Sequence, residues 1–298
     1  MLLGKTLGSP RVQSRALAIL VLFAVAGCGK PERAATGRQR ERLRLATTTS
    51  TEASGLLSYL LPPFEKRENI KVDVIAVGTG KALRLGENGD VDVLLVHDRQ
   101  AEDRFVGAGF GVNRRDVMHN DFVLVGPARD PAGIKGLSDA SRAMRRIAGT
   151  AFASRGDESG THAKERELWA AADITPAGSW YLSTGQGMGE TLMIADEKQA
   201  YCLTDRATYL AYRDKLELVI LCEGDPRLMN YYGVIAVNPA KYPHVNYSGA
   251  MRLVAYLTSR AGQEKIADFT IGGKQAFVAD AVPRANRSVA AKGSNTER

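Results

Sequence analysis

The residues with the clearest chemical potential form the run Ser154 to His162, which reads Ser-Arg-Gly-Asp-Glu-Ser-Gly-Thr-His. A helix is expected immediately after it, from Ala163 to Ala172. The start of a helix carries backbone N–H groups without partners and the positive end of the helix dipole. Because Arg155, Ser159 and Thr161 add further hydrogen-bond donors there, the segment predicts a binding site for an oxyanion.

A second hydroxyl-rich segment, Thr47 to Thr51, lies earlier in the chain. The apolar stretch Leu43 to Ala46 precedes it, and a helical-looking stretch from Gly55 to Leu61 follows. This pattern predicts a strand, a short turn and a helix, and in α/β sheets such turns lie at the carboxyl ends of strands, where ligands bind. We expect the two segments to lie on separate structural units that close on one ion.

The N-terminus is typical of a secreted protein. Three basic residues precede an eleven-residue apolar run, Ala16 to Ala26, which is too short to remain as a membrane-spanning helix. The sequence Val25-Ala26-Gly27-Cys28 resembles a bacterial lipoprotein box, which implies that residues 1–27 are a signal peptide and that Cys28 is lipidated. The alternative is an ordinary signal peptide with a coincidental cysteine. Both interpretations place the mature protein outside the cytoplasm.

The positive charge of the chain is concentrated at its ends. The formal net charge is +7, of which residues 1–42 carry +6 and residues 284–298 carry +3, so the intervening body carries −2. A protein that binds nucleic acid needs a basic patch on its folded domain, and we therefore expect no nucleic-acid partner. Residues 28–42 are expected to form a flexible tether, and residues 284–298 a disordered tail.

Two cysteines remain if Cys28 is lipidated. Cys202 and Cys222 form a candidate disulfide for an oxidising compartment, although two buried free thiols are equally compatible with the sequence. Neither cysteine has a metal-ligand spacing, and the four histidines show no zinc-ligand spacing either. We expect no bound metal cation.

Strand-like and helix-like segments alternate along the body, which predicts an α/β fold with a largely parallel sheet. A second set of such segments begins after Gly126-Pro127, and a long strand is expected from Tyr231 to Val237. We therefore predict two α/β lobes joined by a two-segment hinge. Lobe 1 comprises residues 43–126 and 231–283, and lobe 2 comprises residues 127–230.

Several motifs resemble the tungstate-binding TupA family. The resemblance runs from about Leu43 to Phe277 and rests on these segments: Ala46-Thr47-Thr48-Thr49-Ser50, Val77-Gly78-Thr79-Gly80, Gly89-Asp90-Val91-Asp92-Val93-Leu94, Asn120-Asp121-Phe122-Val123, Ser154-Arg155-Gly156-Asp157 with Ser159-Gly160-Thr161-His162, and Gly185-Gln186-Gly187-Met188-Gly189. Members of this family are extracytoplasmic solute-binding components of ABC importers with the type II periplasmic-binding fold. The resemblance implies a monomer without a cofactor that delivers tungstate, or molybdate, to a permease and ATPase complex, and that touches the membrane only through its lipid anchor.

The resemblance also implies a set of ligand-binding residues. Tungstate is a fully deprotonated dianion at neutral pH, so its site needs donors only. The expected ligand-binding residues are Thr48, Thr49, Ser50, Thr79, Arg155, Ser159, Gly160 and Thr161, with the backbone N–H groups of Gly187 and Met188 as candidate additional donors. The glycines around Gly187 are also compatible with a helix that simply packs closely on the sheet. Asp157 is expected to turn away from the ligand and to orient Arg155.

Two alternatives stay open at this point. A phosphate- or sulfate-binding protein of the same fold would carry a similar motif, and in phosphate binders the aspartate can accept the proton of hydrogen phosphate. A serine hydrolase using Ser159 and His162 is the remote alternative, because these residue types suit a nucleophile and a base but stand three apart at one helix start. We expect a binding protein, with no catalytic residues.

Overall fold

The computed structural model describes residues 40–281, so the predicted signal peptide, Cys28 and the predicted tail lie outside the described residues. From the N-terminal side, the elements are β1 (Glu41–Thr48), α1 (Thr49–Ala53), α2 (Leu56–Glu68), β2 (Ile70–Val77), α3 (Thr79–Asn88), β3 (Val93–Val96), α4 (Arg99–Gly107), β4 (Gly111–Gly126), α5 (Ala140–Ile147), β5 (Phe152–Ser154) and α6 (Gly160–Ala171). They continue with β6 (Tyr181–Ser183), α7 (Met188–Glu197), β7 (Tyr201–Asp205), α8 (Arg206–Tyr212), η1 (Arg213–Lys215), β8 (Val219–Cys222), η2 (Pro226–Leu228), β9 (Met229–Val237), α9 (Tyr247–Thr258), α10 (Arg260–Asp268), β10 (Thr270–Ile271), β11 (Lys274–Gln275) and β12 (Val278–Ala279).

The principal sheet has the strand order β2-β1-β3-β9-β4-β7-β5-β6. Strands β2, β1 and β3 are parallel, and so are β7, β5 and β6, whereas β9 and β4 in the middle pair antiparallel with their neighbours. The predicted α/β fold is therefore confirmed, but the sheet is mixed and not largely parallel, because the long strands β9 and β4 pair antiparallel with their neighbours. Within residues 40–281, no helix combines the length and the apolar character that a membrane crossing requires.

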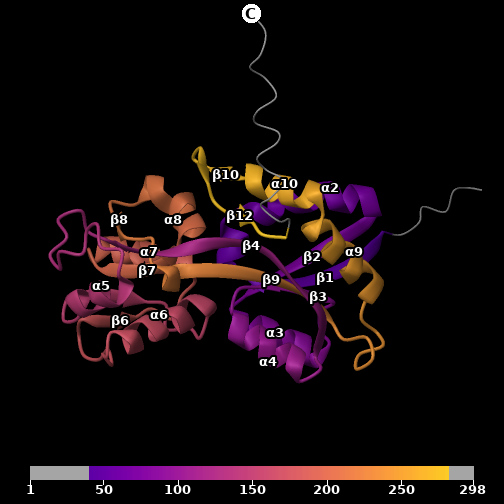
Figure 1. The fold of residues 1–298 in the computed structure, drawn as a ribbon, viewed down its shortest axis with the longest axis horizontal. Coiled ribbons are helices and arrows are strands. Elements are labelled where there is room, and N and C mark those ends of the chain that lie inside the picture. The colour runs from indigo at the N-terminus through magenta and orange to yellow at the C-terminus, as the bar shows by residue number, and fades with distance from the viewer. Residues whose placement is uncertain (1–39, 282–298) are drawn as a thin grey trace, which may run out of the picture. The chain divides into compact units, whose positions relative to one another are not determined.

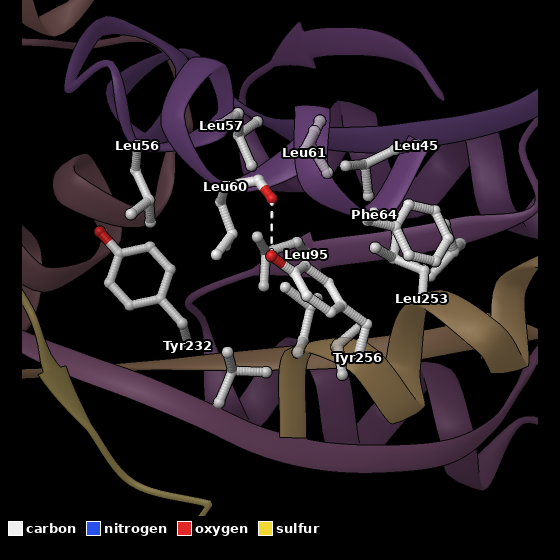
Figure 2. Close-up of a cluster of buried hydrophobic side chains, with 14 of the residues drawn as sticks. Leu45, Leu56, Leu57, Leu60, Leu61, Phe64, Leu95, Tyr232, Leu253 and Tyr256 are labelled. Atoms are coloured by element: carbon white, nitrogen blue, oxygen red, sulfur yellow. Dashed lines mark hydrogen bonds between the residues drawn. The ribbon is translucent and has the colours of Figure 1, made fainter. Parts of the chain in front are cut away.

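The first group of strands is covered by helices on both faces. Successive residues of β1 point to opposite sides, so Leu45 packs with the core under α2 and α9 whereas Ala46 packs with the core under α3 and α4. Figure 1 shows α2, α9 and α10 on one side of these strands and α3 and α4 on the other. Figure 2 shows the larger of the two cores, where the Tyr256 hydroxyl donates a 2.9 Å hydrogen bond to the carbonyl oxygen of Leu60.

The second group of strands is built in the same way. In the last part of β4, Phe122 and Leu124 face the core formed with α5 and α6, whereas Val123 and Val125 face the core formed with α7 and α8. The last part of β4, β5 and β7 are therefore buried on both faces, whereas β6 at the edge of the sheet is largely exposed.

Strands β4 and β9 connect the two groups. The first part of β4 pairs with β9, and from Phe122 onward β4 pairs with β7. At the change of partner the two connecting segments lie side by side, with Asn120 opposite Asn230 and Asp121 opposite Met229. The predicted lobe limits at residues 126 and 231 stay predictions, but these paired segments are where a hinge would act.

The candidate disulfide between Cys202 and Cys222 is not formed. Both residues are buried free thiols, and their strands, β7 and β8, flank β4 on opposite sides. Adjacent strands are about 4.8 Å apart, so the two Cα atoms lie well beyond the roughly 7 Å limit for a disulfide. Cys202 and Cys222 also face different cores. The separation of Cys202 and Cys222 in the sequence is compatible with a disulfide, but β4 lies between the two residues and prevents one.

Candidate anion-binding site

Four helices begin directly after strands or strand loops and carry the predicted site residues at their starts. These helices are α1, α3, α6 and α7, with Thr48, Gly78, Ser159 and Gly187 as their respective N-cap residues. Side-chain hydroxyls cap α1 and α6, whereas the glycine caps of α3 and α7 supply no side-chain hydrogen bond. The first-turn N–H groups of α3 and α7 therefore keep more of their capacity to bind an anion.

Parallel strand pairing brings these helix starts together in two pairs. Thr48 at the end of β1 lies opposite Val77 at the end of β2, so α1 and α3 begin next to each other. Ser154 at the end of β5 likewise lies opposite Ser183 at the end of β6, which places the loops that lead into α6 and α7 side by side. Helix α1 also packs against α7, which connects the two pairs.

The two pairs meet at close contacts between residues that are far apart in the sequence. An Nη2 nitrogen of Arg155 lies 3.4 Å from Oγ1 of Thr49. A Cβ atom added to Gly160 would lie 3.1 Å from Oγ1 of Thr79 and 3.1 Å from Cε1 of His97. The structure therefore brings Thr49, Thr79, Arg155 and Gly160 together, and Gly160 is glycine because a side chain would push against both neighbours.

Arg155 is held in a buried position by Asp157. Its side chain is only 3 % exposed, and Nη2 donates to Oδ2 of Asp157 over 2.5 Å. The other carboxylate oxygen of Asp157 accepts from the backbone N–H of Ser159 at 3.2 Å. Both oxygens of Asp157 are thus occupied within the loop, as expected for a residue that orients the guanidinium.

Buried donors without partners concentrate in this region. Among the described residues, five buried side-chain atoms have no hydrogen-bond partner: Thr79 Oγ1, Arg114 Nη2, Arg155 Nε, Thr161 Oγ1 and Arg252 Nε. Three of the five belong to the predicted site. Leaving such an atom unpaired costs about 1–3 kcal/mol, so three in one place require an explanation. Oxygen atoms of a bound anion would satisfy all three.

The hydroxyl run Thr47 to Thr51 divides into different roles. Thr47 donates to the carbonyl oxygen of Leu95 at 2.8 Å and so serves the sheet. Thr48 Oγ1 accepts from the backbone N–H of Thr51 and lies 2.7 Å from Thr51 Oγ1 and 3.1 Å from Ser50 Oγ. The Thr48 hydroxyl is therefore engaged in capping α1, whereas Thr49 contacts Arg155.

Gly187 and Met188 offer the site only backbone N–H groups. The Met188 side chain is buried in the core beneath α7, together with Leu192. A Cβ atom on Gly187 would lie 2.5 Å from Oε2 of Glu190 in the first turn of the same helix. Whether their N–H groups reach a ligand stays a prediction.

His97 lies next to the predicted site residues but was not among the residues that the sequence predicted for the site. It follows β3, where its Nε2 lies 3.5 Å from Ser50 Oγ and its Nδ1 lies 2.9 Å from Oδ1 of Asn230. Burial lowers the pKa of the His97 imidazole, so the ring is neutral at neutral pH. The only available sequence signal was its place directly after a buried strand.

The arrangement of Ser159 and His162 does not support the hydrolase alternative. Ser159 Oγ accepts from the backbone N–H of His162 at 3.3 Å, and Nδ1 of the His162 ring accepts from the backbone N–H of Glu158 at 3.1 Å. Both side chains thus accept hydrogen bonds from backbone N–H groups at the start of α6 and do not form a nucleophile–base pair. Across residues 40–281, no cluster of three or more metal-ligating side chains occurs.

Comparisons with known proteins place this geometry in a family. Residues 32–261 match the family model described as a PBP superfamily domain. The tungstate-binding protein TupA of Peptoclostridium acidaminophilum is 46 % identical over 276 residues, which cover 90 % of this chain and 96 % of that protein. The chain belongs to the TupA family of the PBP superfamily. The periplasmic-binding fold expected from the motifs is thereby confirmed.

Solved structures agree with this membership in the TupA family. The crystal structure titled as the tungstate ABC transporter from Geobacter sulfurreducens is 57 % identical, has a TM-score of 0.72, and is matched over 77 % of this chain and 99 % of its own. The tungstate-binding protein TupA from Desulfovibrio alaskensis G20 is 47 % identical with a TM-score of 0.70, and the match covers 81 % of this chain and all of that one.

Directly behind the site of this TupA-family protein lies a buried carboxyl group, Glu165 on α6. Its Oε1 accepts from the Tyr181 hydroxyl at 2.7 Å and from Nε1 of Trp169 at 3.2 Å. Burial raises the pKa of Glu165 to about 7, because the carboxylate loses more stabilisation from water than the hydrogen bonds from Tyr181 and Trp169 restore. Tyr181 OH also lies 3.0 Å from Oγ of Ser154, next to Arg155.

We predict that Glu165→Gln changes how stability depends on pH. The folded pKa of about 7 exceeds the ordinary value of 4.5, so the folded state binds more protons between these values and stability falls as pH rises through this window. Glutamine keeps the acceptor oxygen and has no proton to lose. Relative to wild type, the variant should gain up to about 3 kcal/mol between roughly pH 4.5 and 7, measured by urea unfolding. Parallel stability curves for the two proteins would contradict this prediction.

Proposed function

We propose that this chain binds tungstate outside the cytoplasm and delivers it to the permease of an ABC importer. The observation that carries the proposal is the group of unpartnered buried donors on Thr79, Arg155 and Thr161. Proteins named as tungstate-binding TupA that are 43–46 % identical to this chain support it. These relatives are named as binding proteins, and the proposal contains no catalytic step.

The chemistry of the site matches a fully ionised oxyanion. Tungstate offers oxygen acceptors only, and the site offers a guanidinium, hydroxyls and helix N–H groups. A buried dianion loses its hydration, and this loss must be offset by oriented dipoles and charge. Each charge-assisted hydrogen bond contributes about 1.5–3 kcal/mol, so several donors acting together reach submicromolar affinity.

The same geometry favours tungstate over hydrogen phosphate. A phosphate that still carries a proton needs an acceptor, and Asp157 already uses one lone pair of each oxygen on Arg155 and Ser159, so such a proton would have to compete for the remaining ones. Sulfate is fully ionised but smaller, so it would reach fewer of the donors at once. Molybdate has the same charge and nearly the same size as tungstate, and the proposal includes it as a second ligand. Calorimetric titration with these four anions tests the order.

We predict that Thr161→Val separates ligand binding from stability. Valine has nearly the same shape but removes the buried, unpartnered hydroxyl. The free energy of unfolding without ligand should rise by about 1 kcal/mol, while tungstate affinity should fall about tenfold. The measurements are urea unfolding and calorimetry.

Thr47→Val is the matched control. The Thr47 hydroxyl is equally buried but donates to Leu95, so its loss should lower stability and leave tungstate affinity unchanged. If Thr161→Val lowered stability and preserved affinity, the hydroxyl would be structural and the proposed site would lose its main support.

We also predict that Arg155→Ala weakens tungstate binding at least tenfold, or by about 1.4 kcal/mol, because it removes the positive charge of the site. Arg114→Ala provides the control. Arg114 is likewise mostly shielded from solvent, ion-paired with a carboxylate and left with one unpartnered nitrogen, but it pairs with Glu102 on α4. The Arg114 variant should lose stability while its folded fraction keeps wild-type affinity. If Arg155→Ala bound tungstate as tightly as Arg114→Ala does, Arg155 would not be a ligand-binding residue.

The proposal includes attachment to the membrane through a lipid on Cys28, which lies outside the described residues. A labelled fatty acid supplied to cells that express the chain should be incorporated into wild type, because a thioether-linked lipid needs the Cys28 thiol, and Cys28→Ala should abolish incorporation. Label retained by the variant would show that lipidation does not use this cysteine. The folded part is proposed to act as a monomer without a cofactor.

A further inference from the structure

A line of buried polar side chains runs from the site across both connecting strands. Nδ1 of His97 lies 2.9 Å from Oδ1 of Asn230, Nδ2 of Asn230 lies 2.8 Å from Oδ1 of Asn120, and Nδ2 of Asn120 lies 3.4 Å from Oδ1 of Asp205. Asn120 and Asn230 are directly paired residues of β4 and β9. All four side chains are buried. None of the four side chains belongs to a hydrophobic core, and the line ends at the site.

The carboxylate of Asp205, at the opposite end of the line from His97, determines the direction of every hydrogen bond in the line. Asp205 accepts only, and it already accepts from the backbone N–H and the hydroxyl of Thr208. Asn120 must therefore present its nitrogen to Asp205 and its oxygen to Asn230. Asn230 in turn presents its oxygen to His97, which must carry its hydrogen on Nδ1. Nε2 of the neutral ring is left as an acceptor.

This acceptor controls the hydroxyl of Ser50. Nε2 of His97 lies 3.5 Å from Ser50 Oγ, whose other hydroxyl neighbour is Thr48 at 3.1 Å. A neutral His97 leaves Nε2 as a buried acceptor, and donation from Ser50 satisfies it, which turns the oxygen lone pairs of Ser50 toward a site that must hold an anion. Rotating the hydroxyl toward an anion would leave Nε2 buried without a donor, which is unfavourable. A proton on Nε2 removes the conflict, because Nε2 then donates to Ser50 Oγ.

Burial is the largest influence on the His97 ring, and it opposes this proton whether or not an anion is bound. The cation of Arg155 and the start of α6 at Gly160 disfavour a positive ring, whereas Asp98 and Asp205 favour one. The remaining close neighbours, Tyr232 and Phe122, are aromatic rings. A bound dianion would add negative charge beside Ser50 and Arg155. The balance at His97 would then shift toward the protonated ring.

We propose that His97 is a positioning residue that takes up one proton from solvent when tungstate binds and thereby turns the Ser50 hydroxyl toward the ligand. No covalent bond changes in this step: one proton moves from solvent to Nε2, and the hydrogen bond between Nε2 and Ser50 Oγ reverses its direction. This inference rests on the proposed tungstate binding, and it makes ligand uptake dependent on pH through a group that does not touch the ligand.

Calorimetry of tungstate binding in buffers of different ionisation enthalpy tests the inference, because the apparent enthalpy then reports protons taken up. Wild type should take up a fraction of a proton per tungstate, and its affinity should fall as pH rises, by at most about tenfold per pH unit. Tungstate binding without proton uptake would overturn this inference and leave the proposed function intact. Absence of tungstate binding would overturn both.

Two variants identify the group that takes up the proton. His97→Gln can place an amide nitrogen near the position of Nε2 as a permanent donor, so it should bind tungstate with no proton uptake and with weak pH dependence. His162→Gln is the matched control, because His162 is the histidine next to Asp157 and its pKa is also lowered by burial. Uptake should persist in that variant. Loss of uptake in His162→Gln and its retention in His97→Gln would overturn the assignment.

A measurement on wild type covers the case in which His97→Gln does not fold. The nitrogen-15 spectrum of the imidazole groups distinguishes a neutral ring from an imidazolium. Addition of tungstate should convert one buried histidine from the Nδ1–H neutral form to the doubly protonated form. A spectrum in which no histidine changes its protonation state would overturn the inference.

Discussion

Parallel strand pairing is the constraint on which the site depends. Because β1 pairs in parallel with β2, and β5 with β6, the segments that leave these strands emerge at the same edge of the sheet. Each pair supplies two helix starts, and the backbone N–H groups of a first helical turn have no partner within the helix. The backbone alone therefore brings the positive ends of several helix dipoles together, whatever side chains the loops carry. Arg155 and the threonine hydroxyls add to a potential that the backbone has already created.

Much of this arrangement could be predicted from local sequence. The long strand expected from Tyr231 to Val237 and the helix that follows the Arg155 segment appear at the expected places. The donors on Arg155 and Thr161 were predicted as well, because a hydroxyl or guanidinium beside a helix start is a local pattern. Their contact with Thr49 and Thr79 depends on the whole fold.

Other features had no local signal. The first part of β4, from Gly111 to Asp121, was not predicted because charged residues such as Arg114 and Arg115 interrupt its alternation, and its register with β9 shifts twice. The hydrogen-bonded line from His97 to Asp205 joins residues on four separate elements. No spacing in the sequence connects them, since only the sheet order places Asn120 beside Asn230.

The two buried cysteines have a consequence for how the chain matures. Burial raises the pKa of both thiols, so neither forms the reactive thiolate readily, and β4 keeps the sulfur atoms apart. The folded body therefore needs no oxidase or isomerase to reach its native covalent state. It can therefore assemble equally well with or without oxygen.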